Sequence, residues 1–164
     1  MARPHWGLVL ALTLVVAPSM GKRGPLLIWN VSPSAPTGLY WVGRRVPHFG
    51  DLAVVQLPPH MAMLASAREY LPRTAYLLKP VAAASGDRVC RHGSHVFVRG
   101  IFAARALATD RQQRPLPRWQ GCHILRAGQL FLLSREPESF DSRYFGLIQA
   151  EHILGRATLL FRGP

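Results

Sequence analysis

Two hydroxyl groups separated by a single proline could take part in chemistry together. Ser32 and Ser34 flank Pro33 in the stretch 31–41 (VSPSAPTGLYW), and Pro36 follows closely. Proline fixes φ at about −65° and biases the preceding residue toward extended conformations, so this stretch cannot form a helix. On an extended segment, side chains two residues apart point the same way. The spacing therefore suits a serine nucleophile with a second hydroxyl beside it, and a surface loop punctuated by proline is the alternative.

A single lysine is the candidate base for such a nucleophile. Lys79 is the only lysine after Lys22, in a chain that otherwise uses arginine for positive charge. Arginine keeps its proton in proteins, whereas a lysine shielded from water can lose it and activate a serine hydroxyl. Lowering the pKa of a lysine from about 10.4 to neutrality destabilises its ammonium form by about 4 kcal/mol. The apolar neighbours Leu77, Leu78 and Val81 favour burial, and the alternative is a lysine that reaches solvent from an apolar strand.

Short apolar runs separated by glycine and proline predict a mainly β domain with one short helix. We expect strands over residues 39–42, 52–57, 76–84, 95–100, 129–134 and 157–161, and a helix over residues 61–71 that ends at Pro72. Residues 103–121 hold no strong pattern, because Pro115 and Pro117 argue against a helix or a central strand there. There is no regular alternation of strands and helices, so a parallel sheet is not expected.

An uncharged run from Trp6 to Met20, between Arg3 and Lys22, predicts an N-terminal membrane helix. As a helix it would span about 22 Å of a hydrocarbon core about 30 Å thick, and basic residues at its ends could reach the interfaces. We therefore expect an anchor over residues 1–23 and a catalytic domain over residues 24–164. A cleaved secretory signal is the alternative, and both would export the domain. The basic residues that follow the run argue against export, because the positive-inside rule would keep the domain on the cytoplasmic side.

The charge balance points to an anionic partner. The chain has 20 Lys and Arg against 8 Asp and Glu, a formal net charge of +12. The arginines are spread along the whole chain, and the sequence has no helix-turn-helix, zinc-finger or RNA-recognition pattern. We therefore expect the anionic partner to be a lipid surface rather than nucleic acid.

The cysteines and histidines give no metal-binding pattern. Cys90 and Cys122 are the only cysteines. In an exported domain they allow one disulfide, and the sequence alone leaves open whether it forms. His92 and His95 lie in an H-G-S-H stretch without a third ligand, which indicates an exposed hairpin. We expect no metal and no cofactor.

Four stretches, in order, resemble the successive boxes of the bacterial type I signal peptidase family. They are SPSAPTGL at 32–39, GDLAVV at 50–55, KPVAAASGDRV at 79–89 and SFDSRYFG at 139–146. The S-x-P-x-G-L-Y-W form of the first box and the R-Y-F-G ending of the last resemble the TraF branch, the conjugative-transfer signal peptidases that mature pilin precursors. The resemblance implies coiled antiparallel β-sheets and a catalytic domain on the periplasmic side of the inner membrane.

By position, the resemblance implies a serine–lysine dyad with Ser34 as the nucleophile and Lys79 as the general base. The S-x-P spacing of the TraF branch selects Ser34 over Ser32. The backbone N–H of Ser34 and the hydroxyl of Ser32 would form the oxyanion hole, and losing one such donor typically costs about 10²–10³ in rate.

The last box implies the residues that support the dyad. Ser139 would orient the Lys79 amine, and an ion pair between Asp141 and Arg143 would brace the loop that carries Ser139. If this turn is extended, the two charged side chains point the same way. Asp141 also occupies a position that the family links to cyclisation of the pilin, and the resemblance leaves open whether the pilin is only cut or is also joined end to end.

The expected function is a membrane-anchored serine endopeptidase that cleaves exported pilin precursors in conjugation or type IV secretion. Its expected partners are the pilin precursor and the inner membrane, and we expect a monomer. A non-catalytic basic scaffold of the secretion apparatus is the alternative from another class. A self-cleaving regulator with the same dyad would need a DNA-binding domain, for which a chain of 164 residues has no room.

Overall fold

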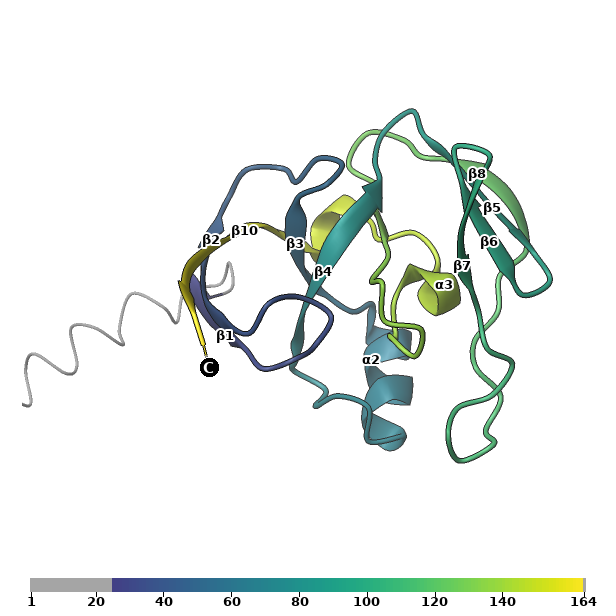
Figure 1. Ribbon diagram of the computed structural model, residues 1–164, viewed down its shortest axis with the longest axis horizontal. Helices are drawn as coiled ribbons and strands as arrows, with labels where there is room; N and C mark the ends of the chain where they lie inside the picture. Colours follow the sequence, from purple (N-terminus) through teal and green to yellow (C-terminus); the bar gives the residue numbers. More distant parts are fainter. Residues whose placement is uncertain (1–24, 164) are drawn as a thin grey trace, which may run out of the picture.

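The computed structural model describes residues 25–163 and consists of two antiparallel sheets with short helices between them (Figure 1). A six-stranded sheet has the order β1-β2-β10-β3-β4-β9, and a four-stranded sheet has the order β7-β6-β5-β8. The strands are β1 (Leu27–Asn30), β2 (Gly38–Gly43), β3 (Leu52–Gln56), β4 (Tyr76–Ala83), β5 (Arg88–His92), β6 (His95–Val98), β7 (Ile101–Arg105), β8 (Gly121–Ile124), β9 (Phe131–Leu132) and β10 (Ile153–Arg162). The helices are α2 (Pro59–Ala67), α3 (Ser142–Phe145) and the 3-10 turn η2 (Ala150–His152).

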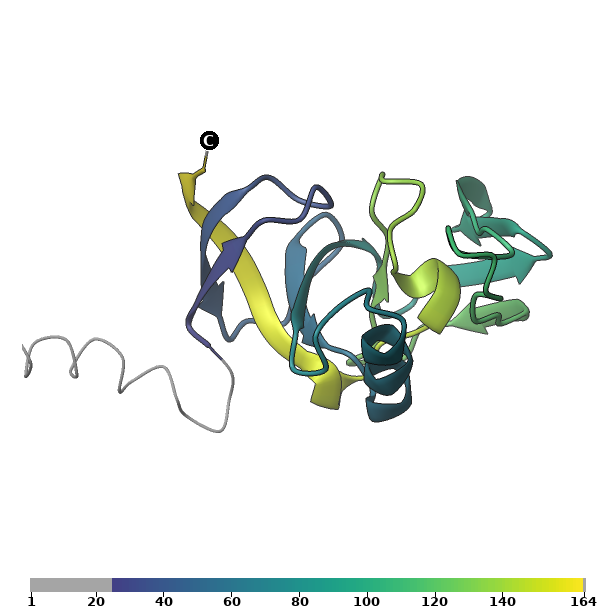
Figure 2. The same cartoon turned by 90° about the horizontal axis from the view of Figure 1, so that it is seen from below.

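The last strand of the chain lies inside the large sheet. β10 lies between β2 and β3 and pairs antiparallel with both, and its register shifts near Gly155. This glycine has φ +154°, and a Cβ on it would lie 2.0 Å from the carbonyl oxygen of Gly43. Only glycine allows the backbones to approach so closely at this bend. Figure 2 shows the sheet curled, with β10 running across it beside β2 and β3.

Apolar side chains fill both faces of the curled sheet. On one face, Val54 and Leu78 pack with Tyr40 and Val42. On the other, Val55 and Leu77 pack with residues of α2 and β9 in a second cluster. Because strand side chains alternate, Lys79 shares its face with Leu77 and is paired with Ala53 on β3, and Leu77 and Ala53 are both members of this second cluster. The fold thus surrounds the candidate base with buried hydrocarbon, as its apolar neighbours predicted.

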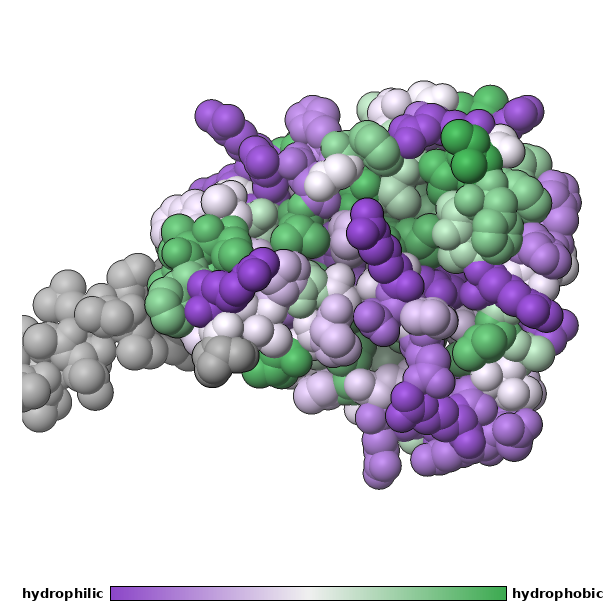
Figure 3. Space-filling view, viewed as in Figure 1, coloured by the Kyte–Doolittle hydropathy of each residue, from purple (hydrophilic) through white to green (hydrophobic). Residues whose placement is uncertain are grey.

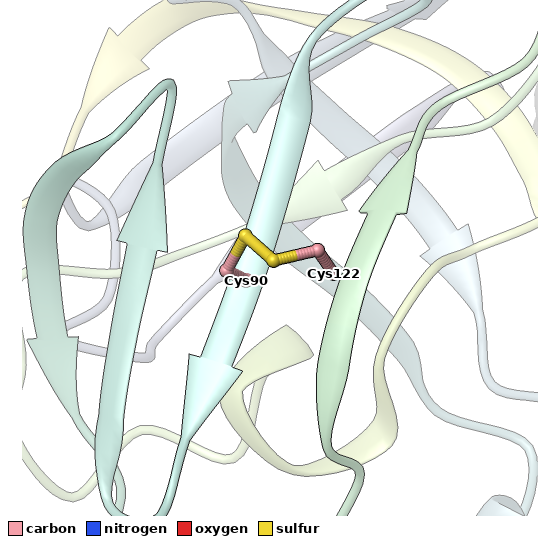
Figure 4. Close-up of a disulfide and its surroundings, with 2 residues drawn as sticks. All are labelled: Cys90 and Cys122. Carbon is pink, nitrogen blue, oxygen red and sulfur yellow. A yellow bond between two sulfur atoms is a disulfide. The ribbon is translucent and has the colours of Figure 1, made fainter.

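The small sheet is a set of hairpins joined by a disulfide. β6 and β7 are connected by Arg99 and Gly100, which both have positive φ (53° and 81°), as a two-residue hairpin turn requires. Cys90 on β5 and Cys122 on β8 are paired directly across the strands and form a disulfide (Figure 4). His92 lies within 4.8 Å of both sulfur atoms, but these sulfurs are bonded to each other and offer no thiolate to a metal.

The sequence predicted the presence of the strands more accurately than the residues at which they begin and end. The strand expected at 129–134 is only Phe131–Leu132, because Leu130 instead pairs with Ile148 in an isolated bridge. The last strand begins at Ile153, before the run expected at 157–161. Residues 103–121, where no pattern was found, hold the end of β7 and the start of β8. Both strands lie at the edges of the small sheet, where a weak sequence pattern suffices.

Two helical predictions also change. The helix expected at 61–71 is Pro59–Ala67, because proline is well tolerated in a first helical turn and Glu69 has a left-handed φ of 60° that ends the helix early. The turn near Asp141 is the helix α3 rather than an extended segment. The predicted membrane anchor lies outside the described residues. Within residues 25–163, no helix is long and apolar enough to span a bilayer.

Candidate active site

The loop after β1 holds the two serines against each other. The Oγ atoms of Ser32 and Ser34 are 2.7 Å apart, and the backbone N–H of Ser34 donates to Ser32 Oγ at 3.3 Å. The two hydroxyls therefore lie on the same side, as expected. The reason differs from the prediction, because Pro33 and Ser34 form a turn rather than an extended segment.

A buried asparagine, which the sequence did not single out, builds this turn. Asn30 is 6% exposed, and its Nδ2 donates to the carbonyl oxygens of Ser32, Ala35 and Pro36 at 2.9–3.0 Å. Its Oδ1 accepts from the Ser32 N–H at 3.1 Å. Asparagine side chains commonly replace backbone partners in turns, so the only available signal was an asparagine just before a proline-rich loop.

Lys79 lies in the middle of β4 with its side chain 5% exposed. Its Nζ donates to the Oγ of Ser139 at 2.7 Å, across 60 residues of sequence. Burial lowers the pKa of Lys79 to about 8, while attraction to Asp141 opposes the shift and repulsion from Arg143 adds to it. A substantial fraction of the amine is therefore neutral near pH 8, and a neutral amine can accept a proton.

An internal ion pair holds the loop that carries Ser139. Arg143 Nε and Nη2 donate to the Asp141 carboxylate at 2.8 and 2.9 Å, and both side chains are at most 2% exposed. Arg143 also donates to the carbonyl oxygens of Pro137 and Ser134 at 2.7 Å. The Ser134 N–H donates back to Asp141 at 2.9 Å. The structure thus places the expected pair where it braces the Ser139 loop.

The two charged side chains meet for a reason that the sequence did not reveal. Asp141 is the N-cap of α3 and accepts from the Arg143 N–H at 3.1 Å. Aspartate is a preferred N-cap because its carboxylate satisfies N–H groups that a helix leaves unpaired. The side chains converge because a helix begins here, and not through strand alternation.

Ser34, Lys79 and Ser139 line one cavity of about 870 Å³. Among the described residues, no hydrogen bond joins Ser34 Oγ to Lys79 Nζ: Ser34 Oγ is bonded to Ser32 Oγ, and Lys79 Nζ to Ser139 Oγ. The loop and the strand thus present a hydroxyl and a buried amine to the same space.

Another wall of the cavity comes from the segment after α2 and the connection between β7 and β8. Tyr70 donates to the Asp110 carboxylate at 2.5 Å, and Arg114 Nε donates to it at 2.6 Å. Arg68 reaches across to the carbonyl oxygen of Pro115 at 2.7 Å. Hydrophilic residues gather on this side of the molecule, below the small sheet in Figure 3. The sequence did not predict this wall, because its two segments, residues 68–70 and 110–115, meet across 40 residues or more of sequence.

Residues 4–162 match the family described as signal peptidase, peptidase S26. The chain belongs to the signal peptidase family. It is 37% identical to the conjugal transfer protein TraF of Agrobacterium fabrum over 165 residues, which cover 93% of this chain and 92% of that one. It is 31% identical to a plasmid transfer protein TraF of Escherichia coli over 137 residues, or 76% and 77% of the two chains.

The resemblance to the signal peptidase family and its TraF branch, drawn from four short boxes, is therefore confirmed. A crystal structure of a signal peptidase I from Enterococcus faecalis is similar to 71% of this chain and 100% of that chain, with 15% identity and a TM-score of 0.41. Membership of the signal peptidase family makes a serine peptidase the expected enzyme class.

Proposed function

We propose that this signal peptidase family member is a serine–lysine endopeptidase in which Ser34 is the nucleophile and Lys79 the general base. The observation that carries the proposal is the buried Lys79 amine, whose pKa of about 8 lies close to neutrality and which lines the same cavity as Ser34. A scaffold protein has no need for a lysine that is destabilised in this way.

In the proposed reaction, the neutral Lys79 amine takes the proton of Ser34 Oγ as this oxygen bonds to the substrate carbonyl carbon. The resulting ammonium then gives the proton to the departing amine as the peptide bond breaks. Water repeats the sequence on the acyl-enzyme, again with Lys79 as the base. Ser139 accepts a hydrogen bond from Lys79 Nζ and would keep the amine aimed into the cavity.

The oxyanion of this reaction would be held by the Ser34 N–H and the Ser32 hydroxyl. The Ser34 N–H donates to Ser32 Oγ at 3.3 Å, which is a long hydrogen bond. The substrate oxygen would replace this weak contact with a shorter, charge-assisted one as negative charge develops. Both donors come from the turn that Asn30 builds, so they would be in place before the substrate binds.

The proposed substrates are exported pilin precursors, in keeping with the conjugal and plasmid transfer relatives. We propose that the domain works at the periplasmic surface of the inner membrane, anchored by residues 1–23, and acts as a monomer without a cofactor or nucleic acid. Its net charge of +12 suits anionic lipid. The β1, β2 and β10 end of the large sheet, green at the left of Figure 3, also exposes Trp29, Trp41 and Phe161.

Co-expression of the full chain with a candidate pilin, followed by intact mass measurement, tests the function. Loss of the leader or tail indicates proteolysis, and a further loss of one water indicates cyclisation. Ser34→Ala and Lys79→Ala should each abolish the mass change, and Lys79→Arg should fail as well because arginine cannot act as a base. Ser85→Ala, an exposed serine away from the cavity, is the matched control and should leave processing intact.

The same assay separates the peptidase from the non-catalytic scaffold. A scaffold tolerates Lys79→Gln and still supports transfer, whereas a dyad does not. Normal processing by the Ser34→Ala or Lys79→Ala chain would refute the assignment of the dyad.

A further inference from the structure

Arg91 is a buried arginine on β5, away from the cavity, that the proposed chemistry does not use. Its side chain is 2% exposed, and its Nε donates to the carbonyl oxygen of Gly93 at 3.0 Å. Its Nη1 donates to the carbonyl oxygen of Arg143 at 2.6 Å, across 52 residues of sequence. No ion pair within residues 25–163 includes Arg91.

Burying a guanidinium without a carboxylate is costly, so its two hydrogen bonds must have a strong structural reason. The carbonyl of Arg143 belongs to α3, which is only four residues long, and the last carbonyls of a helix have no partner inside it. Arg91 supplies the donor that this carbonyl lacks. Its bond therefore fixes α3 against the small sheet.

Other hydrogen bonds also hold α3 in place, but they are made to Ser142. Trp119 Nε1 donates to the carbonyl oxygen of Ser142 at 2.9 Å, and the Leu132 N–H donates to Ser142 Oγ at 2.9 Å. Arg91 instead holds the backbone of Arg143, whose own side chain fixes the Ser139 loop through Asp141 and the carbonyl oxygens of that loop.

We infer that Arg91 is a positioning residue: it fixes Arg143, and through Arg143 the loop that presents Ser139 to the Lys79 amine. The inference rests on the proposed function, because it assigns Arg91 a part in that reaction. The strand that carries Arg91 is itself anchored one residue earlier, where Cys90 is bonded to Cys122 on β8. The small sheet thus serves as a fixed support for the catalytic loop.

A positioning role and a substrate-binding role differ in the kinetic constant that they change. Arg91 does not line the cavity, so its loss should leave substrate binding intact and misplace the base. A misplacement of about 1 Å can lower the rate about 100-fold, so a smaller displacement of the base should lower it about ten-fold. We therefore expect an effect on kcat with KM unchanged.

The test uses the full chain in detergent and a peptide spanning the junction mapped by the mass measurement above. Arg91→Met keeps an unbranched apolar side chain in place of the arginine stem and removes the donors, and kcat should fall about ten-fold or more while KM stays within about two-fold. Arg91→Lys keeps the charge and a single donor nitrogen, so it should recover part of the lost kcat. Arg99→Met, which breaks an ion pair with Asp87 between two turns at the end of the same sheet, is the matched control and should leave both constants unchanged.

A wild-type kcat in Arg91→Met, a loss carried entirely by KM, or equal loss in the methionine and lysine variants would each overturn the inference. If Arg91→Met fails to fold by circular dichroism, Arg91→Lys carries the test: a reduced kcat at unchanged KM supports the positioning role, and a wild-type kcat overturns it. Cleavage that survives Ser34→Ala instead overturns the proposed function, so the two failures can be told apart.

Discussion

Replacing Lys79 should make the protein more stable and inactive at the same time. The native environment lowers the pKa of Lys79 from 10.5 to about 8 because burial disfavours the ammonium form. At pH 7, which is below both values, the lysine is charged in the folded and unfolded states. The buried charge therefore lowers the free energy of unfolding by about 3 kcal/mol, at roughly 1.4 kcal/mol per pKa unit. This penalty is full below the folded pKa and disappears as the pH rises from about 8 through 10.5, since the unfolded chain then binds more protons.

The variant Lys79→Met with Ser139→Ala isolates this penalty. The second substitution is included because Lys79→Met alone would leave the buried Ser139 hydroxyl without its partner, at a cost of about 1–3 kcal/mol. We expect the double variant to gain stability relative to the wild type at pH 7. That advantage should shrink by about 2.5 kcal/mol between pH 7 and pH 10, as the wild-type lysine loses its penalty.

Urea unfolding of the full chain in detergent, followed by tryptophan fluorescence at both pH values, measures the two free energies. The difference between the variant and the wild type cancels groups that titrate alike in both proteins. Ser139→Ala alone is the control, and its stability relative to the wild type should not vary with pH in this way. An advantage of the double variant that is the same at pH 7 and pH 10 would refute the reasoning, because the lysine would then be solvated in the folded protein.

Three further outcomes follow from the same geometry. If the neutral amine of Lys79 is the base, kcat/KM for the junction peptide should rise with pH and level off above about pH 8, a profile that a fully exposed lysine would not produce. Ser32→Ala should lower kcat by about 10²–10³ with little change in KM, measured on the same peptide, and a wild-type kcat would remove Ser32 from the oxyanion hole. Replacing Cys90 and Cys122 by serine opens a loop with a sequence separation of 32 and should destabilise the protein by about 3–4 kcal/mol in urea unfolding; an unchanged midpoint would mean that the disulfide contributes nothing.

The residues proposed for the reaction could be singled out from the sequence because they lie in short contiguous patterns. Ser34 lies between two prolines, Lys79 stands alone among arginines, and Ser139 opens a box with Asp141 and Arg143. The mainly β class followed for the same reason, since alternation of apolar runs with glycine and proline depends only on near neighbours. The strand ends were less accurate, as the short β9 shows, because a pairing partner far along the chain decides where a strand stops.

Only the tertiary structure decided how those residues are held. The pKa of Lys79 depends on burial among side chains from several elements and on the charges of Asp141 and Arg143, which lie about 60 residues further along the chain. The turn at Ser34 depends on Asn30, and the backbone of Arg143 accepts a hydrogen bond from Arg91 of the other sheet. The chemistry of each side chain was therefore determined by the sequence, whereas desolvation and hydrogen bonding arise from neighbours that meet only when the chain folds, and no local pattern records them.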